Sequence, residues 1–102
     1  MMKVYPINAK YRVLIVLLEL GGVAKYSDID RILKNSNLRY FVKELKEEGF
    51  IDDRYEGKKH VIMLTQDGEK LARKLKDAEE FVELKIAQAK ARKSFDKQGS
   101  LT

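Results

Sequence analysis

The chain has 102 residues, a length that fits one domain with a modest core and is too short for two independent folds. Hydrophobic residues make up 44% of the sequence and charged residues 36%, which is a globular composition with a heavily charged surface. The formal net charge of +5 favours a polyanionic partner, although many basic proteins bind no nucleic acid. Cysteine is absent, which excludes disulfides, thiolate metal sites and cysteine nucleophiles.

A first helix is predicted at about 9–20, because Asn8 can cap its start and its apolar residues recur at helical spacing until the Gly-Gly pair at 21–22. Val13 and Val16 make its apolar face unusually wide. Such a helix should be nearly surrounded, either by the core of its own domain or by a second subunit.

A second helix is predicted at about 28–34, after a short extended link at 23–26. Ser27 and Asp30 have the spacing of a capping box, in which the side chain of the first residue and that of the third helical residue satisfy each other's backbone amides. This helix is short, and three small polar residues at 35–37 follow it as a turn.

A third helix is predicted at about 37–48, with Gly49 at its C-cap. Apolar residues occupy one face, whereas the start of the other face carries amide, guanidinium, phenol and ammonium groups, with the acidic residues beginning at Glu44. A short helix, a tight polar turn and a second amphipathic helix form a helix-turn-helix, in which the second helix meets base edges in the major groove. The alternative interpretation is an ordinary solvated helix face.

A two-stranded β-hairpin is predicted at about 50–65, where β-branched and aliphatic residues return after a turn at Gly57. Lysines 58 and 59 lie at this turn, and Arg54 and His60 flank it, so the tip of the hairpin is basic. A basic hairpin beside a DNA-contacting helix is a wing, able to lie along phosphates or to reach toward the neighbouring minor groove.

These elements, with "LKEEGFI" at 45–51, the basic hairpin and "LTQDGEKLARKL" at 64–75, resemble the winged helix-turn-helix proteins of the MarR, PadR and ArsR type and small archaeal chromatin and regulator proteins. The resemblance covers about residues 9–76 and implies a mainly α fold with a small β-hairpin, of the α+β class. It implies base contacts from Asn37, Arg39, Tyr40 and Lys43, phosphate contacts from Asn35 and Ser36, and a wing tip at Lys58 and Lys59. Together with Arg54 and His60, these are the predicted DNA-binding residues.

Neither the effector pocket of some of these relatives nor the metal-sensing Cys and His clusters of others has a counterpart in this sequence. We therefore expect no metal, no cofactor and no small-molecule effector.

The last predicted element is a long helix at about 66–96, capped by Thr65 and too long for so small a domain to cover by itself. Its apolar residues alternate at spacings of four and three, which predicts a coiled-coil or paired-helix dimer contact through Leu71, Leu75, Ala78, Val82 and Ala89. The alternative is a helix that folds back over its own domain. We thus expect a winged-helix core at 1–65, a dimerisation helix at 66–96 and a frayed tail at 97–102.

Enzymatic chemistry is not predicted. The only histidine, His60, has no second His or Cys to complete a metal site, so a phosphate-facing or solvated position is expected. Asp52 and Asp53 are neighbours on a strand and point to opposite faces, so they cannot converge on a metal without other ligands. No secretory signal and no apolar segment of membrane-spanning length is present, and we expect a cytoplasmic protein without membrane contact.

The sequence therefore predicts a homodimeric protein that binds double-stranded DNA, with a transcriptional regulator as the first hypothesis. Two alternatives stay open. One is an architectural or DNA-partition protein of low sequence specificity, and the other is a winged-helix protein-protein interaction module whose basic wing is incidental. A steep salt dependence of duplex binding would separate the first two from the third.

Overall fold

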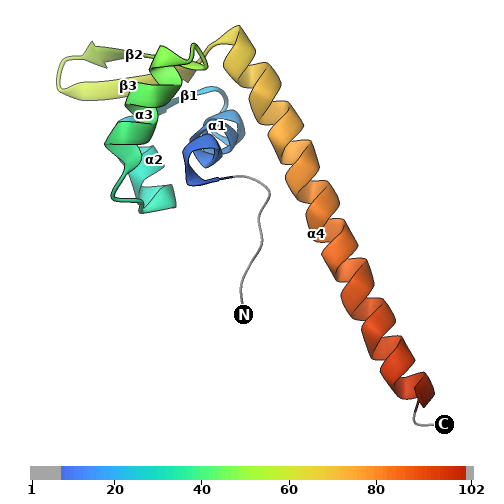
Figure 1. The fold of residues 1–102 in the computed structure, drawn as a ribbon. Helices are drawn as coiled ribbons and strands as arrows, with labels where there is room; N and C mark the ends of the chain where they lie inside the picture. Colours follow the sequence, from blue (N-terminus) through green and yellow to red (C-terminus); the bar gives the residue numbers. More distant parts are fainter. Residues whose placement is uncertain (1–7, 101–102) are drawn as a thin grey trace.

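The computed structural model describes residues 8–100 of the chain, with side chains as far as residue 91. In chain order the elements are α1 (Ala9–Glu19), β1 (Val23–Lys25), α2 (Tyr26–Leu33), α3 (Leu38–Glu47), β2 (Ile51–Glu56), β3 (Lys59–Leu64) and α4 (Gln66–Ser100). The first three helices and the sheet form one packed unit, and α4 leaves that unit as a long rod (Figure 1). This is the predicted α+β winged helix-turn-helix with a long C-terminal helix.

The sheet has three antiparallel strands in the order β1-β3-β2. The hairpin of β2 and β3 was predicted, and its two-residue turn begins at Gly57, whose positive φ of 63° suits the first central position of a type II′ turn. Strand β1, taken from the sequence for an extended link, pairs with β3 from Val23 opposite Met63 to Lys25 opposite Val61. Three residues are too few to show a strand periodicity, so this pairing had no sequence signal.

The hydrophobic core lies between the three short helices and the sheet, with α1 at its centre. Five consecutive residues of α1, Val13 to Leu17, are buried. Four of them, all but Ile15, form a buried cluster with Ile29 of α2, Leu38, Val42 and Leu45 of α3, Ile51 and Ile62 of the sheet, and Ala72 of α4. The wide apolar face of α1, including Val13 and Val16, is therefore covered by the chain's own domain and not left for a second subunit.

The predicted caps of α1 and α4 are present. Asn8 Oδ1 accepts a hydrogen bond from the Tyr11 backbone N–H at 3.2 Å. Thr65 Oγ1 accepts one from the Gly68 backbone N–H at 3.0 Å and donates one to the Gly49 carbonyl oxygen at 2.6 Å. The second bond also fixes the start of α4 to the turn that ends α3, so Thr65 joins two elements as well as capping one.

The capping box predicted for α2 is wrong. Helix α2 starts at Tyr26, directly after strand β1, so Ser27 lies inside the helix and Lys25 stands at the cap position without a side-chain hydrogen bond. At the start of α3, Asn37 occupies the cap position without a side-chain bond. Instead, Asn35 Oδ1 accepts a hydrogen bond from the Asn37 backbone N–H at 2.8 Å, which closes the turn between the two helices.

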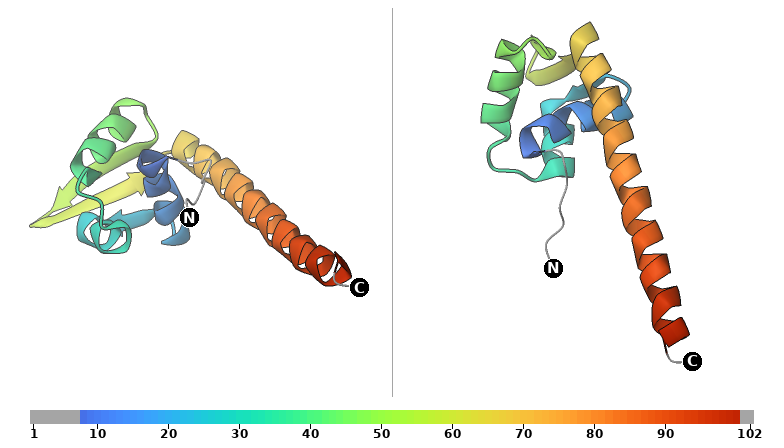
Figure 2. Two further views of the ribbon diagram at one scale, coloured as in Figure 1. Left: turned by 60° about the horizontal axis from the view of Figure 1, so that its bottom comes forward. Right: turned by 45° about the vertical axis from the view of Figure 1, so that its right-hand side comes forward.

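Helix α4 first packs on the domain and then extends away from it (Figure 2). Leu71 and Leu75, two of the predicted dimer residues, pack against the core of their own chain. Arg12 Nη2 lies 2.7 Å from Glu79 Oε2 and ties α4 to α1. The first part of α4 thus packs on its own domain, as the alternative interpretation of this helix predicted, and the later part projects away from the domain.

The helix continues to Ser100, four residues past its predicted end, and positions 101–102 of the predicted tail lie outside the described residues. None of the helices described between residues 8 and 100 is both long enough and apolar enough to cross a membrane.

Candidate nucleic-acid interface

Helix α3 presents a polar face to solvent because its apolar residues recur every three or four positions and pack inward. Leu38, Val42 and Leu45 are buried on the inner face. Arg39, Tyr40 and Lys43, three of the four predicted base-contacting residues, are exposed on the outer face, and Tyr40 is 68% exposed. The exposed ring of Tyr40 between the cations Arg39 and Lys43 suits DNA, whose phosphates are negative and whose grooves also present apolar groups such as the thymine methyl.

The turn before α3 exposes two of its three polar residues. Ser36 and Asn37, the fourth predicted base-contacting residue, are exposed, whereas Asn35 is half-buried and its amide oxygen is occupied by the hydrogen bond that closes the turn. Lys34 precedes them with a left-handed backbone, at φ 49°. The turn therefore exposes Ser36, for which a phosphate contact is predicted, and Asn37, for which a base contact is predicted, beside the start of α3.

The wing tip carries Lys58 and Lys59, both exposed. Arg54 is exposed as well, but its Nη2 lies 2.7 Å from Glu56 Oε1 on the same strand. Surface ion pairs of this kind stabilise by about 0 to 1 kcal/mol, so a phosphate can replace the carboxylate at small cost. The two lysines are thus the principal cations of the tip, and Arg54 is available at its base.

His60, for which a phosphate-facing or solvated position was predicted, is largely covered. Its side chain is 22% exposed, and its Nε2 lies 2.7 Å from Asp53 Oδ2. The imidazole stacks on Tyr55 with ring centroids 4.4 Å apart and on Tyr26 with centroids 5.5 Å apart. The predicted DNA contact of His60 stays a prediction, and the structure shows the ring packed between two tyrosines.

Between α3 and the wing lies an open hollow of about 420 Å³. Its lining residues come from α2, α3 and the sheet, and they are Tyr26, Arg39, Val42, Lys43, Lys46, Asp53, Tyr55 and His60. Three cations and one carboxylate border it, so the hollow is positive in sum.

Asp53 is the acid of this hollow, and its charge is compensated. Lys46 Nζ lies 2.7 Å from Asp53 Oδ1, and this ion pair, followed by the hydrogen bond with His60, holds the pKa of Asp53 below its usual value. The same pairing raises the pKa of Lys46. Both carboxylate oxygens of Asp53 thus have a partner, one in Lys46 and one in His60. No group of three or more metal-ligating side chains occurs in the part of the chain that the structure describes.

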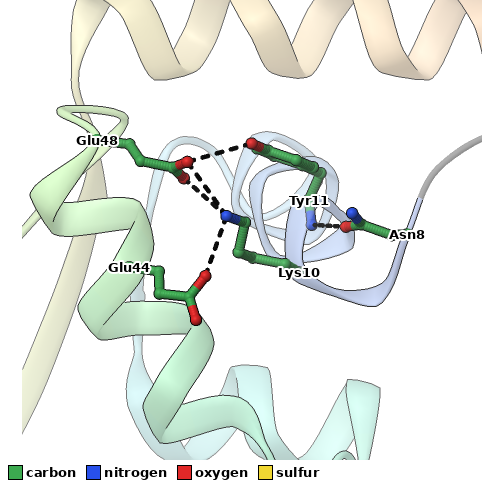
Figure 3. A network of polar contacts seen from close by, with 5 residues as sticks. All are labelled: Asn8, Lys10, Tyr11, Glu44 and Glu48. Atoms are coloured by element: carbon green, nitrogen blue, oxygen red, sulfur yellow. Dashed lines mark hydrogen bonds and ion pairs between the residues drawn. The ribbon is translucent and has the colours of Figure 1, made fainter.

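Two acidic residues, Glu44 of α3 and Glu48 at its C-cap, are held toward α1 by one lysine (Figure 3). Lys10 Nζ lies 3.1 Å from Glu44 Oε2 and 3.1 Å from Glu48 Oε1, and the Tyr11 hydroxyl donates a hydrogen bond to Glu48 at 3.4 Å. The two carboxylates raise the pKa of Lys10, with Glu48 the larger influence. This network neutralises negative charge near α3 and orients the helix on the domain.

The sequence did not identify as site residues five residues that line the hollow: Tyr26, Val42, Lys46, Asp53 and Tyr55. Tyr55 could have been placed opposite His60, because a two-residue turn fixes the register of the hairpin. The others come together only through the packing of α2 and α3 on the sheet, which no local pattern shows.

No protein-family model matches the chain, and a search of curated proteins found no match either. Among solved structures the chain is similar to a reported archaeal mechanosensitive channel that is a structural homologue of MarR-like transcriptional regulators, with a TM-score of 0.71 and 24% identity, covering 84% of this chain and 71% of that one.

It is also similar to MepR, a transcription regulator of the Staphylococcus aureus multidrug efflux pump MepA, with a TM-score of 0.66 and 19% identity, covering 93% of this chain and 79% of that one. Reduced AbfR bound to DNA matches with a TM-score of 0.59 and 17% identity, covering 90% of this chain and 73% of that one. These likenesses confirm the predicted fold: the chain has a winged helix-turn-helix fold, the fold of MarR-like transcriptional regulators.

Proposed function

We propose that the chain is a homodimeric regulator of transcription that binds double-stranded DNA with α3 in the major groove and the β2–β3 wing on the phosphate backbone. One observation carries the proposal: the start of α3, which is exposed and has no acidic residue, and the basic wing tip lie on either side of a positively charged hollow. The fold of AbfR, solved bound to DNA, supports it.

The outer residues of α3 have the chemistry for reading base edges. The guanidinium of Arg39 can donate two hydrogen bonds to a guanine, and such a contact contributes about 1 to 3 kcal/mol of discrimination against a wrong base. Tyr40 offers a ring and a hydroxyl, and Lys43 a mobile ammonium one helical turn from Arg39. These roles are part of the proposal.

The wing has the chemistry for phosphate contacts, which can be tested through salt dependence. Replacing Lys58 and Lys59 with Ala should weaken binding to any duplex and reduce the slope of log K against log salt by about 1 to 2 units, since each lost phosphate contact releases about one counterion fewer. The matched control replaces two exposed lysines of α4, Lys74 and Lys90, with Ala. The control makes the same charge change and should leave the slope close to wild type.

An unchanged slope for the wing variant would mean that the wing points away from DNA. No duplex binding by the wild-type chain at low salt would overturn the proposal and leave the protein-protein interaction module as the remaining hypothesis.

The proposed dimer uses the projecting part of α4. Val82, Ile86 and Ala89 continue the face of Leu71 and Leu75 beyond the point where α1 covers it, and Ile86 is 44% exposed. Phe81, 59% exposed, lies on the flank. A second copy of the same helix would cover this face, and a dimer with two α3 helices about 34 Å apart could occupy successive major grooves.

Sedimentation tests this contact. Val82→Glu with Ile86→Glu places two charges on the proposed seam and should give a monomer with lower DNA affinity, because the second domain no longer binds as part of one molecule. Ala87→Glu with Ala91→Glu is the matched control, since it has the same spacing on the opposite face of the helix and both positions are exposed. Leu75 is left unchanged because it packs in the core of its own chain.

A further inference from the structure

Three nearly parallel rings form a row from the wing to the start of α2. Tyr55 and His60 are opposite each other in the β2–β3 register, and their rings are 8° from parallel at a centroid distance of 4.4 Å. His60 and Tyr26 are 7° from parallel at 5.5 Å. Arg39 Cζ of α3 lies 5.9 Å from the centroid of the Tyr26 ring. The row therefore connects the wing to the helix proposed to read DNA.

A second set of contacts connects the same histidine to α3. His60 Nε2 is 2.7 Å from one oxygen of Asp53, and the other oxygen of Asp53 is 2.7 Å from Lys46 Nζ. His60 is thus the residue shared by two links that end on α3, one at Arg39 and one at Lys46. Both links lie along the hollow between the helix and the wing.

The position of these links matters because the outer part of the wing has no third strand. Strand β1 pairs only with residues 61–63 of β3, so the hairpin from Tyr55 to His60 projects as a two-stranded ribbon. Isolated two-stranded hairpins are marginally stable in water. Contacts at the base of the ribbon therefore decide which direction Lys58 and Lys59 face.

We propose that His60 is a positioning residue for DNA binding, one that fixes the wing relative to α3 so that the lysines of the wing tip meet phosphates while α3 lies in the groove. The inference rests on the proposed DNA binding. It differs from a direct phosphate contact by His60, because the stacked ring acts through Lys58 and Lys59.

A double-mutant cycle in duplex binding tests the inference. His60→Ala removes the middle ring and should lower affinity about tenfold, and Lys58→Ala with Lys59→Ala should then cost less in this background than in the wild type. His60→Phe keeps a flat ring in the row but cannot bond to Asp53, so it should recover a large part of the affinity lost in His60→Ala. A direct phosphate contact would instead make the Phe and Ala variants equally weak.

Tyr55→Ala serves as the second variant if His60→Ala does not fold, because Tyr55 is 71% exposed and its removal breaks the row from the outside. It should show the same loss and the same coupling to the wing lysines. If the wild-type chain binds the duplex, two results would each overturn the inference: additive losses of affinity in both cycles, or a His60→Phe variant that binds as weakly as His60→Ala. Absence of duplex binding by the wild-type chain would overturn the proposed function and this inference with it.

Discussion

Gly68 is the residue of α4 whose replacement by alanine tests the packing of the fold most sharply. In an isolated helix this change would stabilise by about 1 kcal/mol, because glycine is a poor helix former. In the folded chain, a Cβ at this position would lie 1.8 Å from the carbonyl oxygen of Phe50 and 2.8 Å from its carbonyl carbon. Even a tight contact of 3.0 Å would require the two backbones to separate by about 1.2 Å, the difference between 3.0 and 1.8 Å.

That separation would strain the junction between α4 and the turn after α3. The Phe50 carbonyl accepts a hydrogen bond from the Thr65 backbone N–H at 3.1 Å, and Thr65 Oγ1 donates one to Gly49 at 2.6 Å. Overpacking costs about 1 to 3 kcal/mol, and losing two hydrogen bonds adds about 1 kcal/mol each. Subtracting the gain of about 1 kcal/mol in helix propensity leaves a net destabilisation of about 2 to 4 kcal/mol.

Urea unfolding followed by circular dichroism, at one fixed protein concentration, measures this difference. Lys70→Ala is the control, because Lys70 is exposed in the same turn of α4 and its truncation should change the free energy of unfolding by less than about 0.5 kcal/mol. A Gly68→Ala variant as stable as wild type, or more stable, would refute the close approach of α4 to Phe50.

Three further predictions concern the site and its supports. Arg39→Ala should cost about 1 to 3 kcal/mol on a preferred duplex and reduce sequence preference, as measured by competition with scrambled DNA; an equal loss on all sequences would favour the architectural alternative. Lys46 and His60 lower the pKa of Asp53 in the folded state. Their contacts with Asp53 therefore stabilise the fold above the pKa of an unfolded aspartate, about 3.9, and this stabilisation is lost as pH falls through the pKa of the folded state. Asp53→Asn should therefore lower the urea midpoint at neutral pH and flatten its acid dependence, and an unchanged midpoint would contradict the pairing. Because the pKa of Lys10 is raised, its ion pairs contribute their full stabilisation below about pH 10.4 and lose it as pH rises further. Lys10→Met should therefore lose less thermal stability than the wild type between about pH 10 and pH 12, and equal losses in the two proteins would argue against the ion pairs.

The helices and the hairpin were predictable because their signals are local. The run of apolar residues before Gly21 predicted α1, the inward spacing of Leu38 and Val42 predicted α3, and the turn at Gly57 predicted the wing. Strand β1 was missed because it depends on pairing with β3, and the start of α2 at Tyr26 was missed because that strand leads directly into the helix.

The site was predictable only where one helix face defines it. The exposed side of α3 follows from its periodicity, so Arg39 and Lys43 could be placed outward from sequence. The hollow, the covered position of His60 and the close approach at Gly68 depend on contacts between segments far apart in the chain. For the proposed dimer contact, the spacing of apolar residues in α4 was visible in the sequence, but the packing of Leu75 on its own domain was not.

Mapping of backbone amide chemical shifts during titration with a DNA duplex at low salt is the sharpest test of whether α3 and the wing form one DNA-binding surface. We expect the largest shifts at residues 36–43 and 57–59, which flank the hollow, and little change in α4 beyond Glu79. Shifts confined to the projecting part of α4, or no shifts at any residue, would contradict a surface shared by α3 and the wing.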